Sequence, residues 1–366
     1  MFHSRRKFLQ YSAYMGAGAL AMPLAGLAVP SQQKKLGVAL VGLGSYSTHQ
    51  LAPALQQTNH IELRGIVTGT PSKIPVWLEK YRIPEQNVYN YDNFDKIADN
   101  KDIDIVYIVL PNSMHAEFTI RGAKAGKHVI CEKPMSVSVK EGQEMIDACK
   151  KANKQLAIGY RLHYDPFHLE FIRHSRDQVF GKVLAVEASD GFRAGDPNQW
   201  RLKKALSGGG PLMDVGIYAI QGARYTIGEE PIAVTAQEFP KTMPEKFRDV
   251  EESLAWQLYF PGGAIANSYS TYTTNVNRLF AGAEKGWFEI NNAFGYSGQK
   301  MRTNKGPLDI APINQQAAHM DGVALSILEN KPANNVSGEE GLRDMIVIEG
   351  IYEAIASGKK VDLKIG

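Results

Sequence analysis

The first half of the chain alternates short apolar runs with amphipathic stretches of helical period. The apolar runs predict buried strands at 36–42, 61–68, 103–110, 127–132 and 155–160. The stretches between them predict helices at 48–58, 72–81, 113–125 and 138–153. Regular alternation of strand and helix is typical of a doubly wound parallel sheet, which binds its ligands at the carboxyl ends of the strands.

The second half carries longer strand patterns, many of them alternating, at 183–192, 232–239, 253–260, 264–274 and 279–290. Long strands without intervening helices predict an open, largely antiparallel sheet. We expect helices before this sheet and at the C-terminus to cover one face. The serines, threonines and tyrosines of 264–274 are expected to line the other face. The predicted fold class is therefore α/β, with a doubly wound domain over 36–158 and an α+β domain over 159–366.

Composition supports two domains and excludes some partners. The 366 residues are enough for two packed cores. The formal net charge is +3, but Arg5, Arg6 and Lys7 lie in a leader without acids, and removing 1–28 takes the charge to 0. No basic excess then remains to indicate nucleic acid or an anionic membrane. The two cysteines, Cys131 and Cys149, predict buried thiols, because they form no disulfide framework or zinc pattern.

The N-terminal leader has the three parts of a secretory signal. It has a basic start, an apolar region over 8–24 and the small-residue cleavage site Gly26-Leu27-Ala28. Glycines and a proline interrupt the apolar region, so it is too short to cross a bilayer. "SRRKFL" resembles the twin-arginine (Tat) motif, whose pathway exports proteins already folded. We expect a signal peptide over 1–28, a short arm over 29–35, export by the Tat machinery and a periplasmic location.

The turn after the first predicted strand reads "GLGSYS". Gly42 and Gly44 occupy the first two glycine positions of G-x-G-x-x-G, and Ser47 occupies the third. In this motif the first glycine permits the turn, the second admits a pyrophosphate, and the helix N-terminus supplies free N–H groups. Since the motif follows a strand and opens a helix, it predicts dinucleotide binding.

The end of the second predicted strand selects between the two nicotinamide cofactors. NAD sites usually place an acid there for the ribose 2′-hydroxyl, but "VTGTPSK" at 67–73 has none. Thr68, Thr70 or Ser72, together with Lys73, are suited to hydrogen-bond and neutralise a 2′-phosphate. The sequence therefore predicts NADP.

Two further segments carry candidate chemistry. Glu132-Lys133-Pro134 ends the predicted strand 127–132, where a lysine would point into the ligand crevice. A flexible glycine turn at 207–210 feeds a predicted helix in which Asp214 and Tyr218, four residues apart, share one face. Taken singly, each of the three side chains has an ordinary structural explanation. Their significance depends on whether the fold brings them together.

These motifs resemble the glucose-fructose oxidoreductase, inositol dehydrogenase and MocA-like (Gfo/Idh/MocA) family, from about Leu36 to Leu363. The resemblance rests on "GLGSYS", "VLPNSMHAEF", "GKHVICEKPMS", "GYRLHYDP", "QWRL", "GGGPLMDVGIYAI" and "GEEGLRDMIVIEGIYEAI". Tyrosine at 218, where many members have histidine, and the twin-arginine leader are similar to the glucose-fructose and aldose-aldose oxidoreductase branch. The resemblance implies a Rossmann domain that binds NADP, followed by a substrate-binding and dimerisation domain.

The resemblance also implies roles for individual residues. Tyr218 would be the general acid/base, Lys133 would stabilise its phenolate and hydrogen-bond the reacting oxygen, and Asp214 would orient lysine and sugar. The adenosine and phosphate contacts would come from Gly42, Leu43, Gly44, Ser45, Tyr46, Thr68, Gly69 and Lys73. The nicotinamide side would be formed by Leu110, Pro111, Asn112, His115, Glu132, Lys133 and Arg161, with Trp200, Arg201 and Tyr296 from the second domain. The sugar would contact Lys133, Arg161, His163, Asp214 and Tyr218.

The segment "HYDPFH" also raises the question of a metal site. His163 and His168 flank Asp165, but no second acidic cluster accompanies them. The resembling family needs no metal, so none is expected here.

The leading hypothesis is a periplasmic sugar oxidoreductase that retains NADP(H). One aldose would be oxidised at C1 to its lactone, and a second sugar would be reduced to an alditol in a ping-pong cycle. The arm over 29–35 is shorter than in glucose-fructose oxidoreductase, which leaves a conventional NADP-dependent sugar dehydrogenase as an alternative. A non-catalytic sugar or nucleotide sensor is a second alternative. Expected partners are small sugars and a second copy of the chain, as a dimer or dimer of dimers through the C-terminal sheet.

Overall fold

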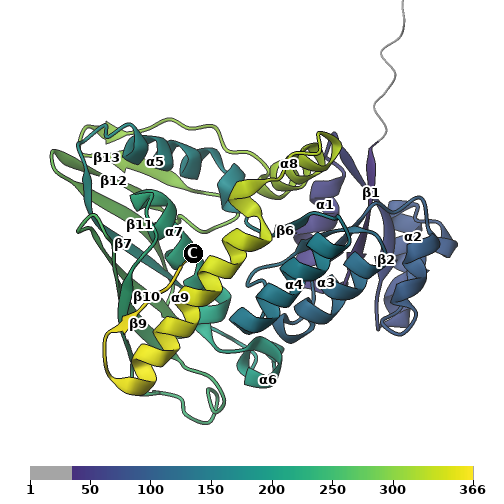
Figure 1. Ribbon diagram of the computed structural model, residues 1–366, viewed down its shortest axis with the longest axis horizontal. Coiled ribbons are helices and arrows are strands. Elements are labelled where there is room, and N and C mark those ends of the chain that lie inside the picture. The colour runs from purple at the N-terminus through teal and green to yellow at the C-terminus, as the bar shows by residue number, and fades with distance from the viewer. Residues whose placement is uncertain (1–34, 366) are drawn as a thin grey trace, which may run out of the picture. The chain divides into compact units, whose positions relative to one another are not determined.

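The computed structural model describes residues 35–365. The expected leader, and all of the expected arm except Lys35, lie outside the described residues. Two sheets organise the described chain, one in each half of the sequence (Figure 1). None of the helices in this part of the chain combines the length and apolar character needed to cross a membrane.

The first sheet is fully parallel, with the strand order β3-β2-β1-β4-β5-β6. This is the order of a dinucleotide-binding doubly wound fold, so the predicted α/β class is confirmed. Its strands are β1 (Leu36–Val41), β2 (Ile61–Val67), β3 (Val88–Tyr89), β4 (Ile105–Ile108), β5 (His128–Cys131) and β6 (Leu156–Ile158). Its helices are α1 (Ala52–Leu55), α2 (Ile74–Tyr81), α3 (His115–Lys124) and α4 (Val139–Lys151). The strand order reverses between β1 and β4, and a ligand crevice is expected at that point.

The second sheet has nine strands in the order β14-β13-β12-β11-β7-β10-β9-β8-β15. Only β7 and β10 pair in parallel, so the sheet is largely antiparallel as predicted. The strands are β7 (Val183–Gly191), β8 (Ala233–Glu238), β9 (Ser253–Tyr259), β10 (Ile265–Thr271), β11 (Val276–Ala283), β12 (Gly286–Asn291), β13 (Lys300–Thr303), β14 (Gly306–Pro307) and β15 (Val361–Asp362). The single strand expected at 279–290 is wrong, because Ala283 pairs with Gly286 in a hairpin that joins β11 to β12.

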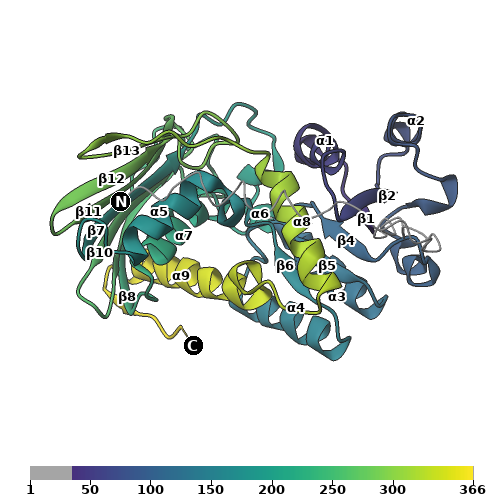
Figure 2. The ribbon, with the colours of Figure 1, turned by 90° about the horizontal axis from the view of Figure 1, so that it is seen from above.

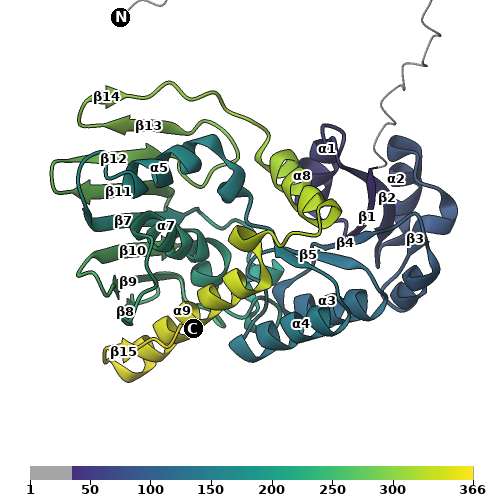
Figure 3. The ribbon, with the colours of Figure 1, turned by 45° about the horizontal axis from the view of Figure 1, so that its top comes forward.

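Helices cover one face of the nine-stranded sheet, the face toward the first domain (Figures 2 and 3). The helices of this half are α5 (Pro166–Arg176), α6 (Lys204–Ser207), α7 (Ile217–Ile227), α8 (Gln315–Leu328) and α9 (Gly338–Ser357), of which α5, α7 and α9 contact the sheet. Helix α8 instead lies beside α1, and α9 contacts both α4 of the first domain and β8 of the second. Asp165, Asn314 and Ser337 begin three of these helices, because each side chain accepts a hydrogen bond from a free amide of the first turn.

The uncovered face of this sheet differs from the expectation for 264–274. Ser268 and Ser270 are buried toward the helices, and the uncovered face carries Ile265, Asn267 and Tyr269. The prediction of a row of serines on that face is therefore wrong. Side chains alternate along a strand, and serine is small enough to pack beneath a helix in the position of an apolar residue.

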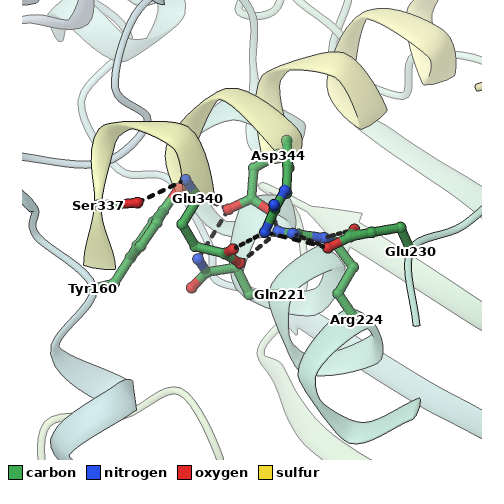
Figure 4. A network of polar contacts seen from close by, with 8 residues as sticks. Tyr160, Gln221, Arg224, Glu230, Ser337, Glu340 and Asp344 are labelled. Atoms are coloured by element: carbon green, nitrogen blue, oxygen red, sulfur yellow. Dashed lines mark hydrogen bonds and ion pairs between the residues drawn. The ribbon is translucent and has the colours of Figure 1, made fainter. Parts of the chain in front are cut away.

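A buried ion-pair network joins α7, α9 and the segment that follows β6 (Figure 4). Arg224 lies 2.5 Å from Asp344, 3.0 Å from Glu340 and 2.7 Å from Glu230. Asp344 also accepts hydrogen bonds from Tyr160, at 2.6 Å, and from Gln221, at 2.9 Å. The network fixes α7 and α9 to one another and to the segment that follows β6.

Candidate active site

A cavity of about 770 Å³ opens at the carboxyl ends of the first sheet, between that sheet and the second domain. Most of the predicted site residues line it. These are Gly42, Leu43, Gly44, Ser45, Tyr46, Thr68, Lys73, Leu110, Pro111, Asn112, His115, Glu132, Lys133, Arg161, Trp200, Arg201, Asp214, Tyr218 and Tyr296. The size fits an extended ligand, because small-molecule sites of proteins span about 300–1,000 Å³.

The turn at 42–47 is shaped as a phosphate-binding loop. Gly42 has φ +96°, and a Cβ there would lie 2.5 Å from the Val109 carbonyl oxygen, so only glycine fits. A Cβ at Gly44 would instead meet nothing within 4 Å, which leaves this backbone accessible from the cavity. Ser47 fastens the turn by donating its hydroxyl to the Gly42 carbonyl at 2.6 Å. The loop therefore fits the pyrophosphate of a dinucleotide.

The end of β2 presents hydroxyls and a lysine to the same cavity. Thr68, Thr70 and Lys73 line it, and Lys73 Nζ donates to the Leu43 carbonyl at 2.7 Å. Gly69 is not among the lining residues, because it packs against Tyr91, whose ring would lie 2.8 Å from a Cβ at this position. The structure thus brings Thr68, Thr70 and Lys73 together at the cavity, whereas Ser72 and Gly69 do not line it.

Lys133, Asp214 and Tyr218 converge on one wall of the cavity. Lys133 Nζ lies 3.7 Å from Asp214 Oδ1, donates to the Asp214 carbonyl oxygen, and lies 4.6 Å from the centre of the Tyr218 ring. Asp214 belongs to a single π-helical turn, Leu212–Gly216, that runs into α7, where Tyr218 is the second residue. Such turns often occur at functional sites. The three candidate catalytic residues therefore form one cluster, although up to 85 positions separate them in the sequence.

Packing holds this cluster in place. The glycine turn before the cluster is tightly packed. A Cβ at Gly209 would lie 1.9 Å from Tyr352 Oη, and one at Gly210 would lie 2.4 Å from the Glu251 carbonyl oxygen. Asn112 Nδ2 donates to the Ser207 carbonyl at 2.8 Å and ties the turn to the first domain. The glycines thus allow close packing that positions Asp214.

The ionisation of Asp214 follows from its neighbours. Burial acts to raise the pKa of this carboxyl, but Arg201 and Lys133 outweigh it and hold the pKa below its usual value. Arg201 Nε lies 3.0 Å from Asp214 Oδ2, and Tyr272 donates its hydroxyl to the same oxygen at 3.1 Å. Asp214 is therefore an anion between two cations and can orient Lys133.

Two other predicted residues are buried behind the lysine. Burial raises the pKa of Glu132, which accepts a hydrogen bond from Tyr107 at 2.7 Å. Burial also lowers the pKa of His115, whose ring nitrogens lie 2.8 Å and 2.9 Å from the Pro134 and Leu110 carbonyls. His115 thus contacts the ends of both strands that form this part of the cavity.

The second domain closes the cavity with aromatic and cationic side chains. Tyr296 stacks on Tyr46 of the glycine turn with ring centres 5.9 Å apart. The Arg161 guanidinium lies 4.5 Å from the Tyr296 ring and 5.3 Å from the Tyr218 ring. Tyr296 and Arg201, which are expected to contribute to the site from the second domain, both line the cavity.

His163 is placed differently from the expected sugar pocket. It is not among the residues that line the cavity, and its ring packs against Tyr160 and Tyr225. Burial lowers the pKa of His163 to about 3, so its imidazole is neutral. The predicted contact between His163 and a sugar is therefore wrong, because the side chain packs in the core.

The other residues of "HYDPFH" are also structural. Asp165 Oδ2 begins α5 by accepting from the His168 amide and lies 2.8 Å from His168 Nδ1. Within residues 35–365, no group of three or more His, Cys, Asp or Glu side chains is arranged to hold a metal ion.

Eight residues that the sequence analysis did not single out also line the cavity. They are Tyr91, Val109, Asp190, Phe192, Gln199, Val215, Asn277 and Phe294. Asp190 had a detectable signal, since a period of two along 183–191 places it on the buried face with Val186 and Ala188. An acid on the apolar face of a strand indicates a polar cavity or a functional site.

Replacing Asp190 with asparagine is expected to change how stability depends on pH. Burial raises the pKa of Asp190 to about 7, partly offset by Lys133, and Asp214 raises it further. A carboxyl whose folded pKa exceeds its unfolded pKa loses its stabilising contribution as the pH rises through the folded value. Relative to Asp190→Asn, the nucleotide-free native protein should therefore lose about 4 kcal/mol of stability between about pH 4 and 7, of which about 3 kcal/mol is lost above pH 5. Urea unfolding at pH 5 and pH 8 measures this, and parallel curves for the two proteins would contradict it.

The strand order, the glycine turn and the Lys133 cluster define an oxidoreductase that binds a nicotinamide dinucleotide. Residues 36–160 match the family model described as an oxidoreductase family with an NAD-binding Rossmann fold, and residues 172–291 match the GFO/IDH/MocA C-terminal domain. The chain belongs to the GFO/IDH/MocA family.

Individual relatives agree with this assignment. The crystal structure of aldose-aldose oxidoreductase from Caulobacter crescentus, in complex with glycerol, is 46% identical with a TM-score of 0.88, and the match covers 90% of this chain and 100% of that one. D-xylose 1-dehydrogenase [NADP(+)] from Haloarcula marismortui is 27% identical, with 89% of this chain and 92% of the relative covered. D-glucoside 3-dehydrogenase from Escherichia coli is 25% identical, with 90% and 97% covered.

Proposed function

We propose that this protein is a sugar oxidoreductase that holds NADP(H), oxidises an aldose at C1 to its lactone and reduces a second sugar to an alditol. The observation that carries the proposal is the cluster of Lys133, Asp214 and Tyr218 at the cavity. The likeness to aldose-aldose oxidoreductase across 90% of the chain supports an aldose as substrate.

The residues of the cluster divide the proton chemistry between them. When bound, the nicotinamide ring accepts or returns a hydride. The Tyr218 phenolate takes the proton of the C1 hydroxyl in the oxidative half-reaction and returns a proton to the carbonyl oxygen in the reductive one. Lys133 stabilises the phenolate and donates to the reacting oxygen, and Asp214 holds Lys133 in that position. Each half-reaction thus moves one hydride and one proton, and the two together restore the enzyme.

A two-step assay tests the ping-pong cycle. Purified protein without added nucleotide is mixed with one aldose, and absorbance of reduced nicotinamide is followed. It should appear after the first sugar and disappear after a second sugar, with lactone and alditol formed in equal amounts. No absorbance change with any aldose, in protein shown to contain NADP, would contradict the proposal.

The short arm favours a conventional dehydrogenase with exchangeable NADP as the second candidate. Strand β1 begins directly after Lys35, so the expected arm has seven residues. Protein that purifies free of nucleotide and turns over sugars only with added NADP would favour this candidate over the retained cofactor.

Replacing Lys73 with alanine is expected to weaken NADP binding about 10- to 150-fold and to leave NAD binding nearly unchanged. The Lys73 ammonium lines the cavity near Thr68 and Thr70, and a charge-assisted hydrogen bond to a 2′-phosphate is worth about 1.5–3 kcal/mol. Titration of refolded, nucleotide-free protein with each cofactor measures the two affinities. Lys80→Ala, on α2 outside the cavity, is the matched control. Equal weakening of both cofactors, or a native preference for NAD, would count against NADP selection.

Export and assembly complete the proposal. The leader supports Tat-dependent transport to the periplasm, which carries a folded protein with its cofactor bound. Fractionation of cells producing the native protein and an Arg5→Lys/Arg6→Lys variant tests this, and equal periplasmic amounts would contradict it. The uncovered face of the nine-stranded sheet supports a dimer or dimer of dimers, and light scattering that gives only a monomer would rule this out.

A further inference from the structure

We propose that Asp190 and Asn277 form a hydroxyl-recognition pair, which binds two adjacent hydroxyls of the sugar away from the carbon that reacts. The inference rests on the proposed function and identifies the part of the cavity that selects the sugar. Its substrate class is an aldose in ring form with both of those hydroxyls free.

The two side chains are brought together by strand pairing. Asp190 in β7 stands directly opposite Asn277 in β11 in the antiparallel register. Side chains at opposite positions of such a pair point to the same face, about 4.5–5.5 Å apart at Cβ. Both residues line the cavity, so this face is the cavity wall on the side of the second sheet.

A neighbouring backbone group fixes which end of the Asn277 amide is free. The Phe294 amide donates to Asn277 Oδ1 at 2.8 Å, so the oxygen is engaged. Within residues 35–365, no group accepts a hydrogen bond from Asn277 Nδ2. Asn277 therefore offers a donor to a ligand in the cavity.

Asp190 complements that donor. Its side chain belongs to a residue only 7% exposed, and no side chain in the described part of the chain forms a hydrogen bond or ion pair with its carboxyl. Asp214, by contrast, has Lys133, Arg201 and Tyr272 as partners. Apart from the backbone amide of Gly191, no group of the described residues satisfies this largely buried carboxyl, so a ligand hydroxyl is the natural source of a further hydrogen bond.

The chemistry of a vicinal diol matches this arrangement. One hydroxyl donates to Asp190, while its neighbour accepts from Asn277 Nδ2. The remaining cluster around Tyr218 engages C1, so a sugar held at both ends has one orientation. A site built to hydrogen-bond a substrate hydroxyl rejects analogues that lack it far more strongly than an apolar pocket does.

The test compares glucose with its 2-, 3-, 4- and 6-deoxy analogues, or the same series of whichever aldose the enzyme oxidises. For the native enzyme, kcat/KM should fall about 10- to 100-fold for two adjacent deoxy positions. In Asp190→Ala, the penalty at one of these positions should disappear, because its partner is already absent. In Asn277→Asp, which keeps the acceptor for Phe294, the penalty at the other position should disappear.

Glu187→Gln is the matched control, since Glu187 lies on the same strand but is exposed on the uncovered face. It should reproduce every native penalty. The content of bound nucleotide, measured by absorbance, should be the same in all four proteins, which shows that cofactor binding is intact. If the native enzyme oxidises aldoses but the Asp190 and Asn277 variants keep all of its deoxy penalties, the pair is refuted while the proposed function stands. If the nucleotide-loaded native enzyme oxidises no aldose, the proposed function itself fails.

Discussion

Replacing Tyr218 with phenylalanine is expected to lower turnover by about 10²- to 10⁴-fold, the contribution of a positioned acid/base. The substitution removes only the hydroxyl. The ring retains its stack on Phe294, with centres 5.9 Å apart, and its place 5.3 Å from the Arg161 guanidinium. Nucleotide content and thermal midpoint should therefore match the native protein. Stopped-flow absorbance in both half-reactions measures the loss, which should appear in each of them.

Tyr225→Phe provides the control for that experiment. Tyr225 lies on the same helix and does not line the cavity, and its buried hydroxyl has no hydrogen-bond partner within residues 35–365. Removing this hydroxyl should leave turnover unchanged. Native turnover in Tyr218→Phe would exclude Tyr218 as the acid/base, and an equal loss in both variants would indicate a general effect on α7.

The first domain could be predicted from sequence because its determinants are local. The apolar runs at β1, β2, β4, β5 and β6 are short, continuous and separated by helical patterns. Such runs are typical of a parallel sheet that is buried on both faces. The turn that holds Gly42 and Gly44 lies next to the strand that precedes it. Lys133 is likewise fixed by its position at the end of β5. Each of these residues lies within a few positions of a strand end, and this short connection places it in the cavity.

The second domain was less predictable because its determinants are distant in sequence. Asn277 faces the cavity only because β11 pairs with β7, some 87 positions earlier in the sequence. Ser268 and Ser270 face inward because the register of β10 puts them beneath helices, which their polarity does not reveal. The family resemblance places His163 at the sugar, but in the structure its ring packs against Tyr225. Pairing and packing, and not local pattern, set these positions.

The network around Arg224 is the strongest case of such a long-range determinant, and it carries the second prediction. Arg224 and Asp344 are 120 positions apart, yet the two side chains are 3% and 0% exposed. Arg224→Met should lower the free energy of unfolding at pH 8 by about 3–5 kcal/mol, because a buried carboxylate is left without its cation. Urea unfolding followed by tryptophan fluorescence measures the change. Arg343→Met, which removes a half-exposed ion pair with Glu340, should cost less than about 1 kcal/mol.

The pH dependence distinguishes a lost charge pair from lost packing. Burial raises the pKa of Asp344 to about 6 even with Arg224 beside it, and removing the arginine should raise it further. Since the folded pKa then lies well above the unfolded one, the variant's deficit should be small at pH 5, where Asp344 is protonated, and should grow as the pH rises. Adding Asp344→Leu should restore most of the stability at pH 8, because an apolar pair avoids the cost of burying charge. A deficit of equal size at pH 5 and pH 8, with no recovery in the double variant, would mean that Arg224 acts through the packing of its aliphatic chain.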